Sequence, residues 1–346
     1  MIKAVWTGTE RLEMIRSAGP PPITRPDEVR IRVTAAGVCG TDVHIWEGRI
    51  SFAAPPLVLG HEFTGVVDEC GPEVRHFSPG DRVKCDSVVG CGECAWCRRG
   101  STQFCPDGYE FGITRDGGWT EWLVAPQRNL HRLPESVSNE VAAILDVEVM
   151  SAFRKPGLRF GESVAIFGAG PAGLIALQCA RVLSAHPVIL CGARRERLEL
   201  GKRLGADHVI DVRSGDTVAR ILDLTGGRGV DLAFDAAGAA QALLDILKVL
   251  RPQGRAILYG VPDRAIPEFP SKEVVLKDLV LYGALSDRTG WDEMIGFVAG
   301  RKIDLQSLIT HRFPFERAAE ALGAVRDRRD GAIKAVLQMP GGETTS

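Results

Sequence analysis

The chain has 346 residues, a length that predicts two domains rather than one core. Its 45% hydrophobic and 25% charged residues are typical of a globular protein, and no apolar run reaches the roughly 20 residues needed to cross a bilayer. The formal net charge of −2 argues against nucleic acid or an anionic membrane as a partner, because both call for a basic surface.

Residues 1–152 predict a β-rich domain. The N-terminus carries charges where a signal peptide would need an apolar run, so we expect a cytoplasmic protein. Short runs of β-branched and apolar residues alternate with turns that contain Gly and Pro, and the clearest runs are 29–38, 63–70 and 81–85. Short strands separated by turns of this kind predict an antiparallel, barrel-like β domain.

Potential metal ligands are scattered through this region. They are Cys39 in VCGTDVH, His61 and Glu62 in LGHEF, and the acidic residues Asp146 and Glu148 in ILDVEV. One thiolate, one imidazole and one carboxylate can make a catalytic zinc site that keeps a position for water or substrate. Spacing alone does not unite these residues, since each of them has an alternative structural role.

Four of the nine cysteines are clustered: Cys91, Cys94, Cys97 and Cys105. In a reducing compartment such clustering indicates a metal rather than disulfides. Four thiolates in a short Gly-containing loop can close tetrahedrally around Zn²⁺ and leave no open position. The lobe at 86–106 is therefore predicted to hold a structural zinc.

From residue 153 to 288, short apolar strands alternate with helical segments, which predicts a doubly wound parallel sheet. The expected strand at 163–170 leads into a G-x-G-x-x-G motif, and a helix is expected at 171–185. A motif in that context binds a dinucleotide, because its glycines allow a tight turn, close approach of the pyrophosphate and close helix packing. The motif reads Gly168-Ala169-Gly170-Pro171-Ala172-Gly173.

The end of the second strand distinguishes NAD from NADP. A carboxylate there would bind the ribose 2′-OH and repel a 2′-phosphate. Small residues followed by two arginines leave room for a phosphate and supply charge-assisted donors to it. We favour NADP over NAD; the alternative is that both arginines merely form the solvated first turn of a helix. The segment reads Gly192-Ala193-Arg194-Arg195.

Later residues complete the expected cofactor site. Asp235 and Gly238 follow the fourth strand of this region and are expected to close the nicotinamide side of the site. Gly260, which ends the next apolar run, is assigned to cofactor binding as well.

The motifs GVCGTDVH (37–44) and LGHEF (59–63), the cysteine lobe and the glycine motif are similar in type and order to those of zinc-dependent medium-chain dehydrogenases. The resemblance covers nearly the whole chain and is strongest to the polyol (sorbitol-like) and L-threonine 3-dehydrogenase branch. It implies a GroES-like β-barrel domain at 1–152 and a Rossmann domain at 153–288. It also implies a C-terminal segment at 289–346 that returns to the first domain.

The resemblance also implies roles for the scattered ligands. Cys39 and His61 would bind the catalytic zinc, and Glu62 would be a third ligand or would exchange with water. Asp146 stands where the branch has an acidic residue at or near the metal, and Glu148 is the weaker candidate. Zinc would lower the pKa of the substrate hydroxyl so that hydride can leave for the nicotinamide.

Three residues near Cys39 receive roles from the same resemblance. Thr41 and His44 resemble the relay that carries the proton to solvent, a task that suits a histidine pKa near neutrality. Asp42 is expected to orient a ligand rather than to bind the metal. The implied enzyme holds two zinc ions per chain and forms a homodimer or a homotetramer.

The implied reaction interconverts a secondary alcohol and a ketone on a small polar substrate such as a polyol, a sugar or a 3-hydroxy amino acid. The substrate stays open, because Ile45, Val147 and Ser286 stand where the relatives have Tyr, Pro and Arg. One alternative is a zinc-independent quinone reductase of the same superfamily. Another is a non-catalytic nicotinamide-binding protein, either a redox sensor or a structural protein.

Overall fold

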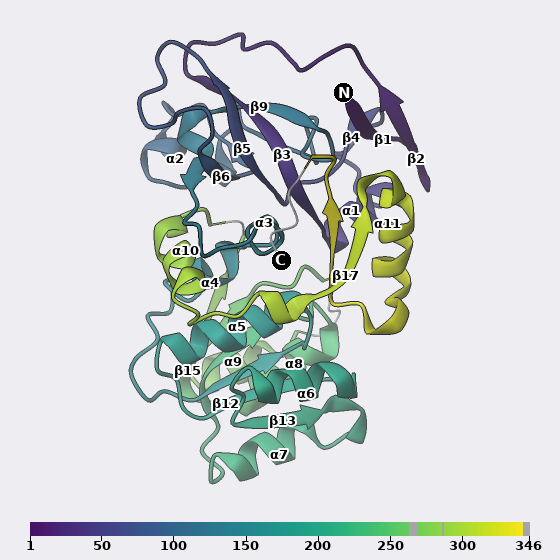
Figure 1. The fold of residues 1–346 in the computed structure, drawn as a ribbon. Coiled ribbons are helices and arrows are strands. Elements are labelled where there is room, and N and C mark those ends of the chain that lie inside the picture. Colours follow the sequence, from purple (N-terminus) through teal and green to yellow (C-terminus); the bar gives the residue numbers. More distant parts are fainter. Residues whose placement is uncertain (263–268, 286, 342–346) are drawn as a thin grey trace. The chain divides into compact units, whose positions relative to one another are not determined.

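A computed structural model describes residues 1–262, 269–285 and 287–341 (Figure 1). The chain divides into two compact units. The first comprises Met1–Leu145, Trp291–Ala299 and Leu305–Ser346, and the second comprises Asp146–Gly290 and Gly300–Asp304. No helix among the described residues is long and apolar enough to cross a membrane.

The first unit is built on a seven-stranded sheet in the order β10-β6-β5-β3-β18-β17, with β9 also paired to β3. Its central strand β3 pairs antiparallel with β5, β9 and β18, and its alternate residues Val29, Ile31 and Val33 are fully buried. The antiparallel β domain predicted from the sequence is confirmed, and the pair β17–β18 is parallel. The strands are β3 (Glu28–Val38), β5 (Phe63–Cys70), β6 (Arg82–Cys85), β9 (Trp122–Pro126), β10 (Leu130–Arg132), β17 (Ile309–Pro314) and β18 (Lys334–Gln338).

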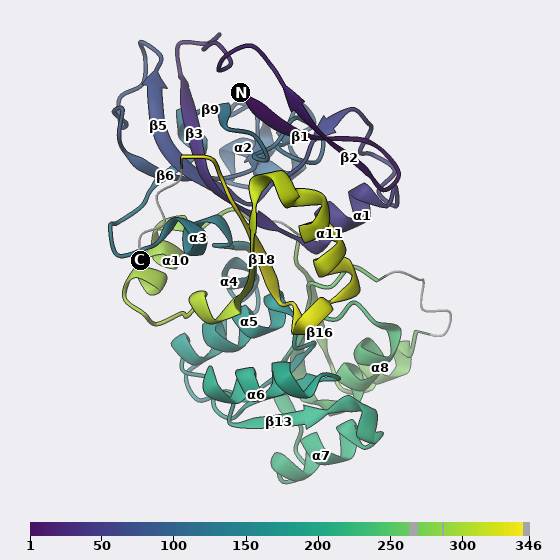
Figure 2. The same cartoon turned by 45° about the vertical axis from the view of Figure 1, so that its right-hand side comes forward.

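Two small sheets and several helices complete this unit. One sheet has the order β2-β1-β4, and the other pairs β7 with β8. Helix α11 packs against α1, β17 and β18 (Figure 2). The small-sheet strands are β1 (Ile2–Gly8), β2 (Arg11–Arg16), β4 (Leu57–Val58), β7 (Val88–Val89) and β8 (Tyr109–Glu110). The helices are α1 (Gly40–Trp46), α2 (Ala95–Arg98), α3 (Asn139–Ala143), α10 (Trp291–Ala299) and α11 (Ala318–Asp327).

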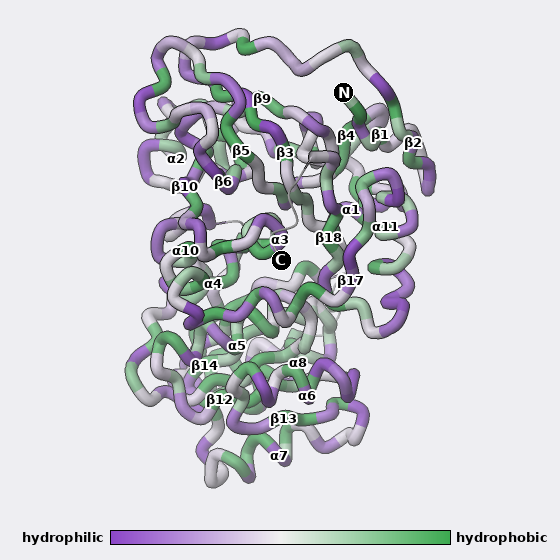
Figure 3. The backbone as a smooth tube through the Cα atoms, viewed as in Figure 1, coloured by the Kyte–Doolittle hydropathy of each residue, from purple (hydrophilic) through white to green (hydrophobic). Residues whose placement is uncertain are grey.

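The second unit is built on a six-stranded parallel sheet in the order β13-β12-β11-β14-β15-β16, which confirms the predicted doubly wound fold. The central strands β11, β12 and β14 are fully buried and made mostly of hydrophobic residues (Figure 3). Strands buried on both faces show such continuous apolar runs. The strands are β11 (Val164–Phe167), β12 (Val188–Gly192), β13 (His208–Asp211), β14 (Val230–Asp235), β15 (Leu250–Leu258) and β16 (Val280–Gly283).

Strand order places the cofactor loops of this unit. The chain runs outward from β11 through β12 to β13 and then crosses back to β14, on the other side of β11. Ligands of such sheets bind at the carboxyl ends of the two strands that flank this reversal. The connecting helices are α4 (Glu148–Ala152), α5 (Pro171–Val182), α6 (Arg195–Arg203), α7 (Thr217–Leu224), α8 (Ala240–Val249) and α9 (Ser271–Leu276).

Candidate metal centres and cofactor site

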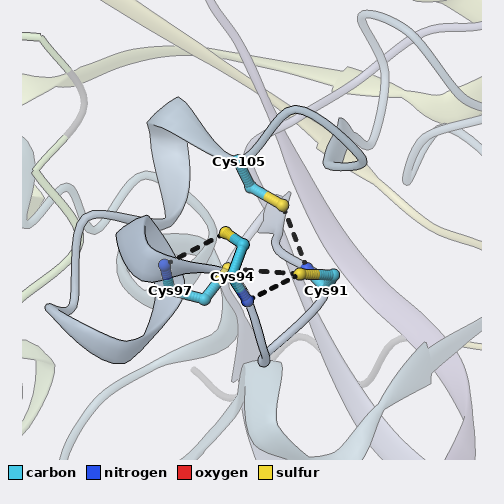
Figure 4. A group of neighbouring side chains, drawn as sticks. All are labelled: Cys91, Cys94, Cys97 and Cys105. Atoms are coloured by element: carbon cyan, nitrogen blue, oxygen red, sulfur yellow. Dashed lines mark hydrogen bonds between the residues drawn. The ribbon is translucent and has the colours of Figure 1, made fainter.

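The cysteine lobe brings four sulfurs together. The Sγ atoms of Cys91, Cys94, Cys97 and Cys105 all lie within 4.8 Å of one another, and the four side chains converge in Figure 4. Cys94 caps the N-terminus of the short helix α2, and its Sγ accepts a hydrogen bond from the backbone N–H of Cys97. Four thiolates at this spacing fit a closed tetrahedral zinc site without an open position.

Backbone N–H groups help to prepare these sulfurs for a metal. The Sγ of Cys91 accepts hydrogen bonds from the N–H groups of Glu93 (3.4 Å) and Cys94 (3.3 Å), which lower the pKa of Cys91 to about 7. Burial and the neighbouring thiols raise the pKa of Cys97 to about 12. A thiolate is the form that binds metal, so the loop favours one thiolate even before the positive ion arrives.

A second group of donor atoms is formed by Cys39, His61 and Glu62, whose ligand atoms lie within 4.8 Å of one another. Cys39 follows β3 directly, and His61 and Glu62 directly precede β5. The two strands are paired, and the backbone N–H of Gly37 donates to the carbonyl of Glu62 at 2.7 Å. Sheet pairing therefore brings the Cys39 and His61 motifs together, although they are far apart in sequence.

The carboxylate of Asp42 contacts both segments that carry the donor residues Cys39 and His61. Its carboxylate accepts hydrogen bonds from the backbone N–H of Cys39 (2.8 Å) and of Gly60 (3.2 Å). The His61 Nδ1 lies 3.3 Å from the same carboxylate. A carboxylate beside Nδ1 favours a ring orientation that leaves Nε2 for a metal, although Nδ1 has no partner in hydrogen-bond geometry among the described residues. The expectation that Asp42 orients a ligand is thus supported by its fully buried position beside His61.

The charges around His61 and Glu62 act on both of their pKa values. Burial opposes the charged form of His61, but Asp42 and Cys39 raise its pKa well above the usual value. Burial likewise opposes the charge on Glu62, but Lys334, His61 and Lys84 together lower the pKa of Glu62. Glu62 is therefore held as a carboxylate inside the protein, which suits a metal ligand.

The two oxygens of the Glu62 carboxylate have different surroundings. One oxygen, Oε1, forms an ion pair with the ammonium group of Lys334. The other, Oε2, is buried without a hydrogen-bond partner among the described residues. A buried carboxylate oxygen left unpaired is costly, so it calls for a partner such as a metal ion. These features make the donor set of Cys39, His61 and Glu62 fit a catalytic zinc ion.

The predicted relay residues lie on α1, the helix that directly follows Cys39. The Sγ of Cys39 and the Oγ1 of Thr41 are 3.9 Å apart. His44 lies three residues after Thr41 on α1, so the two side chains share a face of that helix. The structure thus places Thr41 next to Cys39, with His44 about one helical turn further along α1.

Both acidic candidates near residue 146 belong to the second unit. A carboxylate oxygen of Asp146 accepts a hydrogen bond from the backbone N–H of Glu148 at 2.8 Å, at the start of α4. Glu148 forms an ion pair with Arg288. The partner at Arg288 weakens Glu148 as a metal ligand, whereas Asp146 keeps one carboxylate oxygen outside that hydrogen bond.

The glycine motif has the expected strand-to-helix geometry. Gly168 follows β11 with φ +112°, a conformation that favours glycine. A Cβ on Gly173 would lie 1.7 Å from the carbonyl oxygen of Gly168, so the helix can pack closely only because this residue is glycine. A Cβ on Gly170 would lie 4.0 Å from Nη1 of Arg197.

Arg197 on α6 was not predicted from the sequence as a residue of the cofactor site, because only the fold brings it to the glycine loop. Pro171 and Ala172 form the first turn of α5.

The end of β12 carries no carboxylate. Gly192 ends the strand, and a Cβ there would lie 2.6 Å from the Cβ of Ala169, so this position has no room for a side chain. Ala193 and Arg194 follow, and Arg195 is the first residue of α6. The position of the two arginines at the start of a helix fits both of the interpretations made from the sequence.

The loops after β14 and β15 meet closely. Asp235 ends β14, and its Oδ1 accepts hydrogen bonds from the N–H groups of Ala237 (2.9 Å) and Gly238 (3.0 Å). Burial raises the pKa of Asp235 despite these bonds. A Cβ on Gly260 would lie 2.3 Å from the nitrogen of Gly238. Asp235, Gly238 and Gly260 therefore shape one loop pair at the carboxyl edge of the sheet, where cofactors of such folds bind.

Comparison with known proteins assigns the family. Residues 25–135 match the alcohol dehydrogenase GroES-like domain, and residues 171–300 match the zinc-binding dehydrogenase domain. The L-threonine 3-dehydrogenase of Pyrococcus horikoshii is 34% identical over 339 residues, which cover 94% of this chain and 95% of that protein. The chain belongs to the zinc-dependent medium-chain alcohol dehydrogenase family.

Two further members of this family are informative. The D-arabitol-phosphate dehydrogenase of Enterococcus avium is 31% identical and covers 92% of this chain and 91% of its own length. A zinc-binding dehydrogenase of Sinorhizobium meliloti 1021, solved bound to NADP, has a TM-score of 0.90 at 27% identity and covers 97% of this chain and 98% of its own. The chain is therefore an NAD(P)-dependent zinc alcohol dehydrogenase-type enzyme, and the family resemblance inferred from its motifs is confirmed.

Sequence reasoning about this alcohol dehydrogenase missed Lys84 and Lys334, both buried near Glu62. No motif marked them, and Lys334 is 272 residues from Glu62 in sequence. A lysine in an otherwise apolar strand was the one available signal. Ser286, where polyol dehydrogenases have an arginine, lies outside the described residues.

Proposed function

We propose that the enzyme interconverts a secondary alcohol and a ketone on a small polar substrate, with NADP favoured over NAD. The observation that carries the proposal is the donor group of Cys39, His61 and Glu62, within 4.8 Å of one another. Its three donors are few enough to leave a zinc position for a substrate oxygen. The names of the relatives, which act on threonine or on a polyol phosphate, support the substrate class.

Each residue of the proposed site has a distinct task. Cys39, His61 and Glu62 hold the metal, which when bound lowers the pKa of the substrate hydroxyl. Thr41 accepts the substrate hydroxyl proton while it donates its own hydroxyl proton toward His44, and the imidazole of His44 takes up that proton and in turn releases one to water. Asp42 holds His61 in orientation. Asp146 is proposed as the acidic residue near the metal, ahead of Glu148.

The cofactor side of the proposal rests on the second unit. The glycine motif binds the pyrophosphate at the N-terminus of α5, where backbone N–H groups are unpaired by helix geometry. Arg194 and Arg195 are proposed to bind a 2′-phosphate, since the end of β12 carries no carboxylate that would repel it. A structurally similar family member bound to NADP supports this preference.

The assembly and location are proposals as well. We propose a homodimer or homotetramer, because the edge strand β16 and the preceding α9 expose Val275, Leu276 and Val280. Exposed apolar groups on a sheet edge invite pairing with a second copy, and the mass in light scattering tests this. A cytoplasmic location is proposed because none of the nine cysteines, all of them among the described residues, forms a disulfide, as is usual in a reducing compartment.

A substrate screen tests the proposed reaction. Polyols, sugars, their phosphates and 3-hydroxy amino acids are offered to the zinc-loaded enzyme with NAD or NADP, and reduced nicotinamide is followed by absorbance. We expect turnover within one of these classes, and its loss in Cys39→Ala with nucleotide binding retained. Turnover by Cys39→Ala at the parent rate, or turnover of simple quinones alone, contradicts the proposal.

A further inference from the structure

The carboxylate of Glu62 lies between the ammonium group of Lys334 and the candidate metal position. Its Oε1 is paired with the ammonium group of Lys334, while its Oε2 belongs to the donor group with Cys39 and His61 and has no hydrogen-bond partner among the described residues. Both side chains are nearly buried, with 7% of Lys334 and 13% of Glu62 exposed. Little water is therefore present to screen the pair, and each cation acts strongly on the carboxylate.

A second buried lysine adds to this charge. Lys84 is 2% exposed and lies on β6, where it pairs with Thr64, two residues after Glu62. Its Nζ donates a hydrogen bond to the carbonyl of Ala143 at 2.7 Å. Ile144, the next residue, and Glu62 Oε2 both border Gly37, where a Cβ would lie 3.2 Å and 2.3 Å from them. Lys84 is thus anchored at the edge of the metal centre, on the strand next to Glu62.

The ammonium group of Lys334 and a bound metal ion would compete for this carboxylate, while Lys84 adds positive charge from the neighbouring strand. The carboxylate of Glu62 carries a single negative charge. Because a nearby ammonium group partly neutralises that charge, it weakens the attraction between Glu62 and the metal. Neither lysine can itself bind the metal while it is protonated. Their effect on the metal is therefore expected to pass mainly through Glu62, because the ammonium group of Lys334 is paired with that carboxylate.

We propose that Lys334, assisted by Lys84, is a positioning residue that keeps Glu62 a weak and displaceable zinc ligand, so that the catalytic zinc retains a position for the substrate. The inference rests on the proposed catalytic zinc site and goes beyond it by naming what limits its third ligand. It also accounts for two lysines buried in a β domain, an otherwise costly placement.

The test is the rate at which a chelator removes zinc from the folded enzyme. The structural and catalytic ions are distinguished as two phases, and the catalytic phase is identified by its loss in Cys39→Ala. We expect Lys334→Met to slow the catalytic phase roughly tenfold, a change as large as the smallest losses of affinity seen when groups behind metal ligands are removed, but of opposite sign. A merely structural role predicts the opposite sign, because a loosened site releases its metal faster.

Matched variants complete the experiment. Lys334→Arg keeps the ion pair and should release zinc like the parent, and Lys302→Met removes an exposed lysine of the second unit as a control. In the Glu62→Gln background, Lys334→Met should have little further effect. If Lys334→Met does not fold, Lys84→Met should slow release in the same direction by a smaller factor.

The outcomes separate this inference from the proposed function. Slower catalytic release in Lys334→Met that disappears with Glu62→Gln supports it. Unchanged or faster release in Lys334→Met, or in Lys84→Met where that variant replaces it, overturns it while leaving the catalytic zinc in place. Absence of a catalytic phase from the parent enzyme overturns the proposed function instead.

Discussion

Single side chains decide how the proposed zinc ligands are held. Asp42 lies at the start of α1, and it contacts the backbone of Cys39 and Gly60 and the ring of His61. One carboxylate thus fixes two ligand-bearing loops at once. Lys334, on β18 near the C-terminus, forms an ion pair with the Glu62 carboxylate. These contacts make the ligand geometry a property of the folded domain rather than of the zinc alone.

Cofactor preference is also decided by single residues. Changing both Arg194 and Arg195 to Ala should lower kcat/KM with NADP by about 10–100-fold, if the charge-assisted hydrogen bonds that they make to the phosphate are together worth roughly 1.5–3 kcal/mol. The value with NAD should change little, since NAD lacks the 2′-phosphate. Steady-state kinetics with both cofactors measure the effect, and Arg203→Ala at the other end of α6 is the control. Equal losses with NAD and NADP, or no loss with either, would count against the NADP proposal.

Some residues of the proposed sites could be predicted from the sequence and others could not, for physical reasons. The four lobe cysteines have a spacing that only a metal explains well, so they were predicted without help. Cys39 and His61 are united by pairing of β3 with β5, which no local pattern reports, and the family resemblance had to supply the connection. Lys334 and Arg197 carry no motif and reach their sites only through the fold.

At the scale of elements, the cysteine lobe has little regular secondary structure to hold its shape. It contains the short helix α2 and the brief pair β7–β8, and Trp96 and Phe104 remain half-exposed at its surface. An element with so little apolar burial depends on its metal for stability.

Replacing Cys94 by Ser should therefore destabilise the lobe. We expect the loss of one zinc per chain and a decrease in unfolding free energy of more than about 3 kcal/mol, as expected when a structural metal is lost. Thermal unfolding followed by calorimetry measures the change. Cys70→Ser, a thiol outside both donor groups, is the control and should stay within about 1 kcal/mol of the parent. Equal stability of Cys94→Ser and the parent would show that the lobe does not depend on a metal.

The elements themselves were largely predictable. The expected strands at 29–38, 63–70 and 81–85 differ from β3, β5 and β6 by one residue or less at each end, because runs of β-branched and apolar residues between Gly- and Pro-containing turns mark them in the sequence. The helix expected at 171–185 ends earlier, at Val182. Two residues later Ser184 has a positive φ, which does not continue a helix. Ends of helices depend on local capping, which the apolar pattern does not report.

For the whole molecule, alternation of strands and helices predicted the parallel sheet, but not its strand order or the place of the last strands. In the structure β17 and β18, which follow the second unit in sequence, join the sheet of β3. One of these strands brings Lys334 to Glu62, so the metal centre is completed only when the chain returns to its first unit. Long-range pairing of this kind has no signature in a local window of sequence.

The zinc content of the purified enzyme tests the central claim most directly. The account predicts about two zinc ions per chain in the parent, and about one in either Cys39→Ala or Cys94→Ser, because each variant empties one of two independent sites. Cys39→Ala should lose hydride transfer with its unfolding temperature nearly unchanged. A parent enzyme with less than about one zinc per chain, or a Cys39→Ala variant that keeps both ions, would contradict the assignment of a catalytic and a structural zinc.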